Sequence, residues 1–193
     1  MFAVRHTTNG GKPGAAVRAA FPDRRISAPD PTCVSAMQIH HYRRELGPSL
    51  EEPVSVYPYT MRTFRSATDV PALHTLLQEA YAANGGALAP REEWWRVLST
   101  DPEFDARLVL LVETPVGTLA AACIAWNSGF IKDLVVLPVH RRLGLGSALM
   151  GHACQAFRRR GAHAVALKVE AGNHAAIALY EALGMRRVES VAA

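Results

Sequence analysis

The sequence predicts one α/β domain, in which strands and helices alternate through the second half of a chain of 193 residues. Residues 130–137 are apolar and rich in β-branched side chains, as expected of a buried strand, and Pro138 ends it because proline has no N–H to donate. From Leu145 to Phe157 the apolar side chains recur with the period of a helix. Because this helix leads to a second apolar strand at residues 165–170, the two strands are expected to pair in parallel.

Turn and capping residues set the limits of the other elements. Thr68 or Asp69 is expected to begin a helix that carries Pro71 in its first turn, and Gly184 is expected to end the last helix. The elements predicted in this way are a strand at residues 59–66, a helix that ends at residues 84–86, a short helix at 91–100, a hairpin of strands at 107–113 and 118–126, a helix at 173–183 and a short last strand at 185–191.

The first part of the chain shows no comparable pattern. Residues 1–58 contain most of the prolines and no long periodic run of apolar side chains, so we predict a disordered or loosely packed extension. Residues 59–193 are predicted to form the folded domain. Met37 and Met61 are alternative starts, so it stays open whether all of residues 1–58 belong to the native protein. The last strand lies close to Ala193, and an exposed sheet edge could be covered by the N-terminal segment or by a second subunit in a homodimer.

Composition and charge narrow the classes of function. The net charge is +4, and no RNA-binding motif or aromatic-interleaved basic stripe occurs, so a small anionic ligand is favoured over nucleic acid. The three cysteines are far apart and the histidines form no metal-binding cluster, so we expect reduced thiols, a cytoplasmic location and no metal. No apolar run approaches the roughly 20 residues that a membrane span needs, and the N-terminus lacks the apolar segment of a secretory signal.

The turn between the first apolar strand and its helix has the composition of an anion site. Its sequence is Arg141-Arg142-Leu143-Gly144-Leu145-Gly146. A helix that opens at glycines exposes its first unpaired N–H groups, and the positive end of its dipole favours phosphate, although a purely structural cap is the alternative. The Walker pattern is excluded because Ser147 and Ala148 follow the last glycine. The dinucleotide fingerprint is excluded because Leu149 stands where its third glycine would be.

Two patterns in the second half resemble signatures of the GNAT superfamily of N-acyltransferases. The first, behind a strand that ends in Val-x-Pro, resembles the acyl-CoA signature Gln/Arg-x-x-Gly-x-Gly/Ala. The second resembles Asn-x-x-Ala-x-x-Leu-Tyr-Glu-x-x-Gly-Phe/Met. The matching positions are Arg141, Gly144 and Gly146 in the first pattern and Asn173, Ala176, Tyr180 and Gly184 in the second. The two patterns lie at the separation expected in the superfamily, and the resemblance covers about residues 61–191.

The resemblance implies the GNAT fold, a central mixed and mostly antiparallel sheet flanked by helices, with a parallel strand pair splayed around the acyl-CoA site. It implies acetyl-CoA as co-substrate and a direct attack on it by a primary amine of a small molecule, an amino-acid derivative or a protein. The implied cofactor residues are Val135, Val136, Arg141, Arg142, Leu143, Gly144, Leu145, Gly146, Ser147 and Asn173. Of these, Asn173 would lie nearer the thioester, together with Tyr180.

The implied reaction needs proton transfer. An alkyl amine with a pKa of about 10.4 is neutral only about one part in 2,500 at pH 7, which costs roughly 4.6 kcal/mol, so a base is needed. By position Glu170 and Asp133 are the candidate bases, although carboxylates beside strands are also found solvated or ion-paired. Tyr180 is the candidate acid that protonates the departing thiolate, and its alternative role is to pack its helix against the sheet.

Departures from the superfamily pattern leave alternatives open. Position 142 is often glycine there, so Arg142 either reaches a phosphate or stiffens the turn. Lys132 precedes Asp133 where members that resemble polyamine acetyltransferases carry an acidic residue, which argues against a polyamine acceptor. Trp94 is expected to pack on the sheet or to wall the acceptor site. The alternatives to an acetyltransferase are a non-catalytic acyl-CoA-binding module and an enzyme for a longer acyl-CoA, which would need a deep pocket near Trp94 and Trp126.

Overall fold

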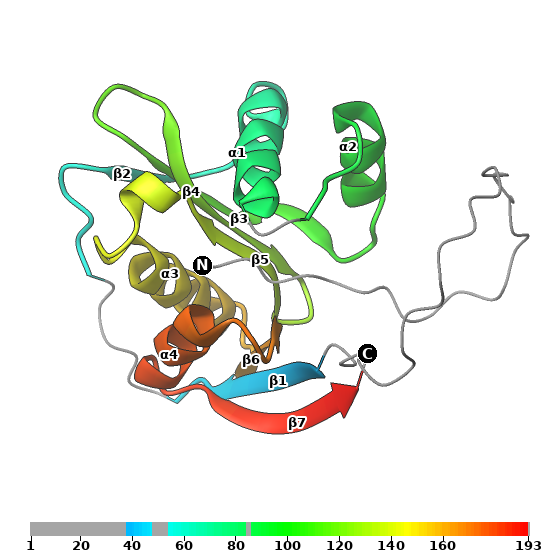
Figure 1. The fold of residues 1–193 in the computed structure, drawn as a ribbon, viewed down its shortest axis with the longest axis vertical. Coiled ribbons are helices and arrows are strands. Elements are labelled where there is room, and N and C mark those ends of the chain that lie inside the picture. The colour runs from blue at the N-terminus through cyan, green and yellow to red at the C-terminus, as the bar shows by residue number, and fades with distance from the viewer. Residues whose placement is uncertain (1–37, 48–53, 84–85, 193) are drawn as a thin grey trace, which may run out of the picture.

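The computed structural model of the protein describes residues 38–47, 54–83 and 86–192 (Figure 1). In these residues one sheet of seven strands is packed against four α-helices. The strands are β1 (Gln38–Glu45), β2 (Thr60–Thr63), β3 (Phe104–Glu113), β4 (Leu119–Trp126), β5 (Phe130–Val136), β6 (Ala164–Glu170) and β7 (Arg186–Ala192). The helices are α1 (Val70–Ala82), α2 (Arg91–Ser99), α3 (Leu145–Arg159) and α4 (His174–Ala182), and a 3-10 turn, η1 (Pro138–His140), precedes α3. None of the helices in these residues is long and apolar enough to cross a membrane.

The sheet is mixed, with the strand order β2-β3-β4-β5-β6-β1-β7. All neighbouring strands run antiparallel except β5 and β6. These two are parallel and pair through Phe130 with Ala166 and through Ile131 with Leu167. Beyond those pairs the strands separate, so the sheet splays toward their carboxyl ends. The predicted α/β class and the predicted parallel pair are therefore confirmed.

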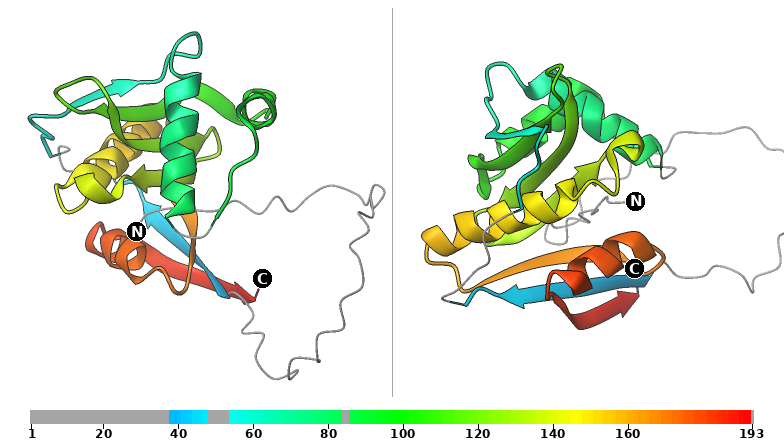
Figure 2. Two further views of the ribbon diagram at one scale, coloured as in Figure 1. Left: turned by 45° about the horizontal axis from the view of Figure 1, so that its top comes forward. Right: turned by 90° about the vertical axis from the view of Figure 1, so that its left-hand side faces the viewer.

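The core is divided between the two faces of the sheet. Leu110 and Leu134 point to the face that α3 and α4 cover, while their neighbours Val109 and Val135 point to the face that α1 and α2 cover. Figures 1 and 2 show α1 and α2 on one side of the sheet and α3 on the other. This alternation follows from the two-residue period of a strand. The sheet therefore separates two apolar layers of the core, one under α3 and α4 and one under α1 and α2.

Strand β1 corrects one part of the sequence analysis. Residues 38–45 belong to the stretch for which the sequence predicts a disordered or loosely packed extension, but they form an interior strand between β6 and β7. A short strand of mixed composition is stable there because it finds backbone partners on both edges. The edge of β6 is thus covered by the N-terminal segment, and a homodimer stays a prediction. The rest of that predicted extension up to residue 53, except residues 46–47, lies outside the described residues.

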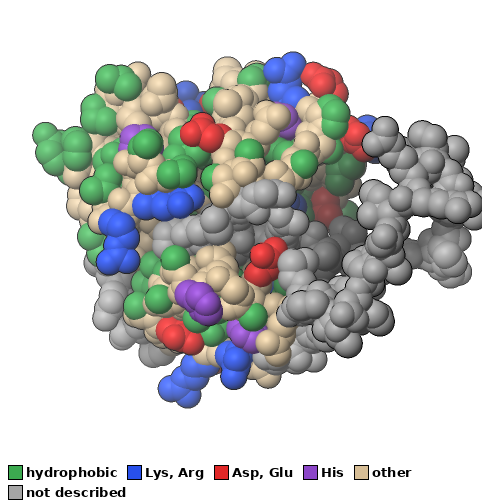
Figure 3. All heavy atoms as spheres, viewed as in Figure 1, with side chains coloured by type: hydrophobic (Ala, Val, Ile, Leu, Met, Phe, Trp, Pro, Cys, Tyr) green, Lys and Arg blue, Asp and Glu red, His purple; other side chains and the backbone are tan. Residues whose placement is uncertain are grey.

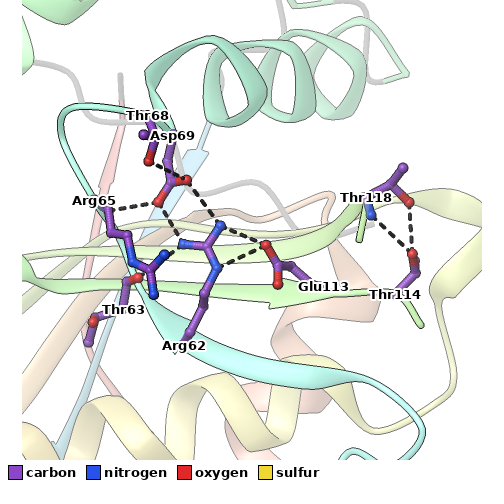
Figure 4. A network of polar contacts seen from close by, with 8 residues as sticks. All are labelled: Arg62, Thr63, Arg65, Thr68, Asp69, Glu113, Thr114 and Thr118. Atoms are coloured by element: carbon purple, nitrogen blue, oxygen red, sulfur yellow. Dashed lines mark hydrogen bonds and ion pairs between the residues drawn. The ribbon is translucent and has the colours of Figure 1, made fainter. Parts of the chain in front are cut away.

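Arg62 ties β2, β3 and the start of α1 together (Figure 4). Its guanidinium donates to Asp69 Oδ2 at 2.6 Å and to Glu113 Oε1 at 2.6 Å. Asp69 occupies the N-cap position of α1, but its side chain makes no capping bond and instead accepts from the Arg65 N–H at 2.7 Å. Burial alone would raise the pKa of Asp69, but the bonds from Arg62 and Arg65 outweigh it and hold that pKa below its ordinary value.

Replacing Arg62 with methionine should lower the free energy of unfolding by about 2 kcal/mol at pH 7, because Asp69 and Glu113 would lose their counter-charge. The loss should be full above the ordinary Asp pKa of about 3.9 and shrink below it, because a protonated Asp69 no longer depends on the guanidinium. Urea unfolding between pH 7 and pH 3 measures this. Arg91→Met removes an exposed ion pair with Glu92 and is the control, with an expected change below about 0.5 kcal/mol. Equal stability of the Arg62→Met and natural proteins at pH 7 would contradict the network.

Arg43→Pro should destabilise the fold by at least about 2 kcal/mol, because an interior strand has a neighbour on each side and proline removes one ladder donor. Arg43→Ala keeps that N–H and removes an exposed side chain that lies opposite Arg186, so it should change stability by less than about 0.5 kcal/mol. Urea midpoints of the two variants provide the comparison. Matching midpoints would show that β1 is not part of the folded sheet.

Candidate functional site

The turn after β5 presents backbone N–H groups at the start of α3. The helix begins at Leu145 behind Gly144, and no side chain caps this end. The N–H of Ala148 donates to Gly144 O at 3.0 Å, which is the first bond of the helix. By helix geometry, the N–H groups of residues 145–147 therefore have no partner within the helix. Together with the positive end of the helix dipole they form a position suited to a phosphate.

Two residues in the left-handed region shape this turn. Arg142 has a φ of 64° and Gly144 a φ of 78°. Glycine adopts this region freely, whereas a residue with a side chain is strained there by about 1 to 2 kcal/mol. Arg141 Nε donates to Val136 O at 3.2 Å and ties the turn to the end of β5. Arg141 therefore holds the turn in place, and Arg142 is kept in a costly conformation beside it.

A pocket of about 350 Å³ opens between this turn and α4. The predicted cofactor residues that line it are Val136, Arg141, Arg142, Gly144, Leu145, Gly146 and Ser147. The sequence analysis missed the other lining residues, which are His140, Ala175, Ala178, Leu179 and Ala182. The four from α4 follow a helical period, which is the signal that could have found them. A Cβ atom at Gly146 would lie 3.2 Å from Leu179 Cδ2, so the glycine lets α3 and α4 meet closely at this pocket.

Val135 and Val136 have different roles in the structure. The N–H of Leu137 donates to Ala120 O on β4. The backbone N–H and C=O groups of successive residues point to opposite edges of a strand. Those of Val135 therefore also point toward β4, whereas those of Val136 point into the gap between β5 and β6. The Val135 side chain is fully buried in the layer of α1 and α2. Val136 is therefore the member of the pair that a ligand in the gap would meet.

Tyr180 lies on α4 with its side chain fully buried. Its hydroxyl has no hydrogen-bond partner in the part of the chain that the structure describes. Burial, with further contributions from Cys123 and Asp133, raises the pKa of Tyr180 far above the ordinary tyrosine value. The side chain does not line the pocket beside the turn, and it lies close to the strands that carry Cys123 and Asp133. A buried hydroxyl without a partner costs about 1 to 3 kcal/mol, so this atom needs an explanation beyond packing.

Asp133 is a buried and paired carboxylate. It is 1% exposed and accepts hydrogen bonds from the Tyr81 hydroxyl and from Lys132 Nζ, the latter at 2.6 Å. The register between β4 and β5 shifts here and leaves Lys132 without an opposite residue, so a bulge accompanies the contact between neighbouring side chains. Both donors are side chains of this chain, so the Asp133 carboxylate belongs to an internal hydrogen-bond network. Tyr81 was not singled out from the sequence, because it lies 52 residues from Asp133.

Three other predicted site residues lie away from the pocket. Glu170 ends β6 opposite Ile39 and is half-buried. The Asn173 side chain caps α4, because its Oδ1 accepts from the Ala176 N–H at 3.2 Å. Leu143 is 53% exposed in the turn. The structure therefore brings the glycine turn and Val136 to one pocket, but it does not place these three residues in that pocket.

A second hollow, of about 240 Å³, lies on the opposite face of the sheet between α2 and β5. Trp94, Trp126 and Lys132 line it, and Lys132 Nζ lies 5.9 Å from the centre of the Trp126 ring. Trp94 is almost fully buried and packs on the His74 ring at 5.3 Å between centroids. Trp94 therefore both packs on the core and walls a hollow.

Other surfaces offer less specific chemistry. A hollow of about 770 Å³ lies between α1 and the β3–β4 hairpin, but its Arg62, Asp69 and Glu113 are already paired with one another. On the face shown in Figure 3 the Lys and Arg side chains lie in separate groups rather than in one stripe. Among the residues that the structure describes, no group of three or more His, Cys, Asp or Glu side chains could hold a metal ion.

Comparisons with known proteins bear on this site. Residues 70–185 match the Acetyltransferase (GNAT) family, which confirms the resemblance seen in the two sequence patterns. A mycothiol acetyltransferase from Salinispora arenicola is 34% identical over 161 residues, which cover 75% of this chain and 50% of that protein. The ribosomal protein bS18-alanine N-acetyltransferase of Escherichia coli is 32% identical over 120 residues, which cover 61% of this chain and 74% of that protein. The chain thus spans half the length of the mycothiol enzyme.

Solved structures are similar in fold. A GCN5-related N-acetyltransferase from Sphaerobacter thermophilus has a TM-score of 0.71 at 24% identity, over 80% of this chain and 50% of that one. AAC(6')-Iy in complex with the bisubstrate analog CoA-S-monomethyl-acetylneamine has a TM-score of 0.57 at 14% identity, over 69% of this chain and 94% of that one. The family match covers more than half of the residues and includes the glycine turn, both strands of the splayed parallel pair and α4. The chain therefore belongs to the acetyltransferase (GNAT) family.

Proposed function

We propose that this chain transfers an acetyl group from acetyl-CoA to a primary amine. The observation that carries the proposal is the uncapped N-terminus of α3, which opens onto the pocket between the glycine turn and α4. The names of the two similar proteins support it, since both are acetyltransferases. Their names also give different acceptors, a mycothiol compound and a protein alanine, so family membership alone leaves the amine open.

The charge and the backbone N–H groups of the pocket support acetyl-CoA as the ligand. The N–H groups of residues 145–147 and the Arg142 side chain would hold the diphosphate. Val136 has no opposite residue on β6, so its N–H is placed to bind an amide of the pantetheine arm. The Tyr180 hydroxyl, unpartnered in the described residues, would meet the thioester end. When bound, acetyl-CoA supplies an acetyl group that is activated by a thiol leaving group.

Tyr180 acts as the general acid in this proposal. The amine nitrogen forms a bond to the acetyl carbon, the carbon–sulfur bond breaks, and the departing thiolate takes the proton of Tyr180. Burial raises the pKa of Tyr180, so its hydroxyl carries that proton at neutral pH. The amine must also lose a proton to a base. We favour Glu170 acting through water over Asp133, because Glu170 is half-buried at the end of β6 and can be reached by water, whereas Asp133 is 1% exposed.

The acceptor would enter from the hollow beside Trp94 and Trp126. This hollow and the glycine turn lie on opposite faces of the sheet, so the amine and the thioester would meet across the splayed strands. Because Lys132 pairs with Asp133 at 2.6 Å, β5 contributes no net negative charge there. Glu93 and Asp101 also line this hollow and favour a cationic group, so we propose an acceptor with a primary amine, such as a small amine or a peptide N-terminus.

The purified protein should bind acetyl-CoA and release free CoA when a suitable amine is added. Tyr180→Phe should lower kcat by at least about 100-fold and leave the acetyl-CoA Kd within about twofold, because phenylalanine fills the same space without a proton to give. Calorimetry and a thiol assay over a panel of amines and peptides measure the two steps. Tyr57→Phe is the control, because Tyr57 is 91% exposed and should change neither value. Binding without CoA release by any amine would favour a non-catalytic module, and unchanged turnover in Tyr180→Phe would remove the acid role.

Arg142→Gly should weaken acetyl-CoA binding about tenfold at low salt, and by less at high salt, because the guanidinium beside a diphosphate is screened. Glycine accepts a φ of 64° without strain, so stability should not fall. Arg107→Ala removes a charge from an exposed side chain elsewhere and should leave the affinity unchanged. If Arg142→Gly instead binds as tightly as the natural protein and gains stability, Arg142 only stiffens the turn.

A further inference from the structure

Strand β1 brings an aromatic side chain against the proposed acid. Tyr42 lies opposite Leu167 of β6 and is 2% exposed. The pairing of β1 with β7 shifts register between His41 and Tyr42, and such an irregularity redirects a side chain. Tyr42 belongs to the same buried cluster as Tyr180, on the face of α3 and α4.

Tyr42 contacts two successive residues of α4. Its ring lies 6.3 Å from the Tyr180 ring between centroids, at an interplanar angle of 50°. Its hydroxyl donates to Glu181 Oε1 at 2.9 Å. Burial and the bond to Glu181 raise the pKa of Tyr42, so the hydroxyl remains a donor at neutral pH. Since neighbouring residues of a helix point about 100° apart, these two contacts hold α4 against rotation about its axis.

The Tyr180 ring depends on such packing for its orientation. No described residue forms a hydrogen bond with its hydroxyl, so polar contacts do not fix the ring. A general acid must come within about 2.6 to 3.2 Å of the atom that it protonates. A displacement of about 1 Å can cost about 100-fold in rate. A neighbouring ring that is itself anchored by a hydrogen bond gives the required fixed surface.

We infer that Tyr42 is a positioning residue for Tyr180, an inference that rests on the function proposed above. Tyr42 does not line the pocket beside the glycine turn, so it would act on the proton transfer and not on cofactor binding. Tyr42 belongs to β1, which lies outside residues 59–193, the range that the sequence predicts for the folded domain. The simpler role of Tyr42 is to hold β1 in the sheet, and a useful test must separate the two roles.

The test is a double-mutant cycle on the full chain with Tyr42→Leu, Tyr180→Phe and the two changes together. Tyr42→Leu should lower kcat for CoA release at least about tenfold and leave the acetyl-CoA Kd within about twofold. In the Tyr180→Phe background the same change should lower kcat by less than about twofold, because the hydroxyl that it positions is absent. Tyr42→Phe keeps the ring and should retain more than about a third of the natural kcat.

A second variant keeps the test decisive if Tyr42→Leu does not fold. Glu181 is exposed, and Glu181→Ala releases the Tyr42 hydroxyl without removing a core side chain. It should lower kcat about threefold in the natural protein and have no effect in Tyr180→Phe. Glu181→Gln keeps the acceptor oxygen and should restore the natural kcat. Urea unfolding confirms that each assayed variant is folded.

The outcomes separate this inference from the proposed function. Proportional losses of kcat in both backgrounds, from either Tyr42→Leu or Glu181→Ala, would overturn the positioning role while the acid role stands. A loss of acetyl-CoA affinity in Tyr42→Leu, with kcat unchanged, would also overturn it. If Tyr180→Phe alone has the natural kcat, the acid role fails and the positioning role fails with it.

Discussion

The parallel pairing of β5 with β6 extends over two residue pairs, and the arrangement of the site depends on this limit. Strands that separate inside a sheet leave backbone groups without their usual partners, and each such group is costly when buried. The structure satisfies one of them itself, because Arg141 Nε donates to Val136 O. The gap is lined farther along by the glycine turn and by α4, so it leads to the unpaired N–H groups of α3. A ligand with amide groups and a diphosphate has the right chemistry for both parts.

A sheet that opens along one edge of a strand needs that strand to be held firmly along the other. On its second edge β6 is paired over its whole length with β1, from Ile39 opposite Glu170 to Glu45 opposite Ala164. Strand β1 therefore gives β6 backbone partners over its whole length on one edge, whereas β5 gives it two residue pairs on the other. The same strand carries Tyr42 onto α4, so one N-terminal segment supports both the splayed strand and the helix of the proposed acid.

The elements that the sequence predicted well are those with local signals. The start of α3 follows from Gly144 and the apolar period after Leu145, and the end of α4 follows from Gly184, whose φ is 75°. The features that the sequence did not predict depend on residues elsewhere in the chain. Strand β1 reads as polar and aperiodic because its pattern is set by β6 and β7, more than 100 residues away. The capping role of Asp69 was wrong in detail, because Arg62 and Arg65 compete for the same carboxylate.

The candidate site shows the same division between local and distant causes. The glycine turn could be predicted because a phosphate position at a helix start is made by consecutive residues. The hydrogen bonds of Asp133 could not be predicted from the sequence. One partner, Lys132, is its neighbour at a bulge, and the other, Tyr81, lies on α1, 52 residues away. The position of Asp133 along the sequence gives no sign of these two hydrogen bonds.

The buried hydroxyl of Tyr180 bears on the two roles that the sequence allows for this residue, and it supports the proposed acid. If Tyr180 only packed α4 on the sheet, phenylalanine would fill the same space and avoid the cost of about 1 to 3 kcal/mol for a buried polar atom without a partner. The described residues supply no partner, and in the proposed function the thioester end of the cofactor would supply it. Burial raises the pKa of Tyr180, so its hydroxyl keeps its proton at neutral pH. A protonated tyrosine has a proton to give to a departing thiolate and cannot act as a base, so this protonation state agrees with the proposed acid role.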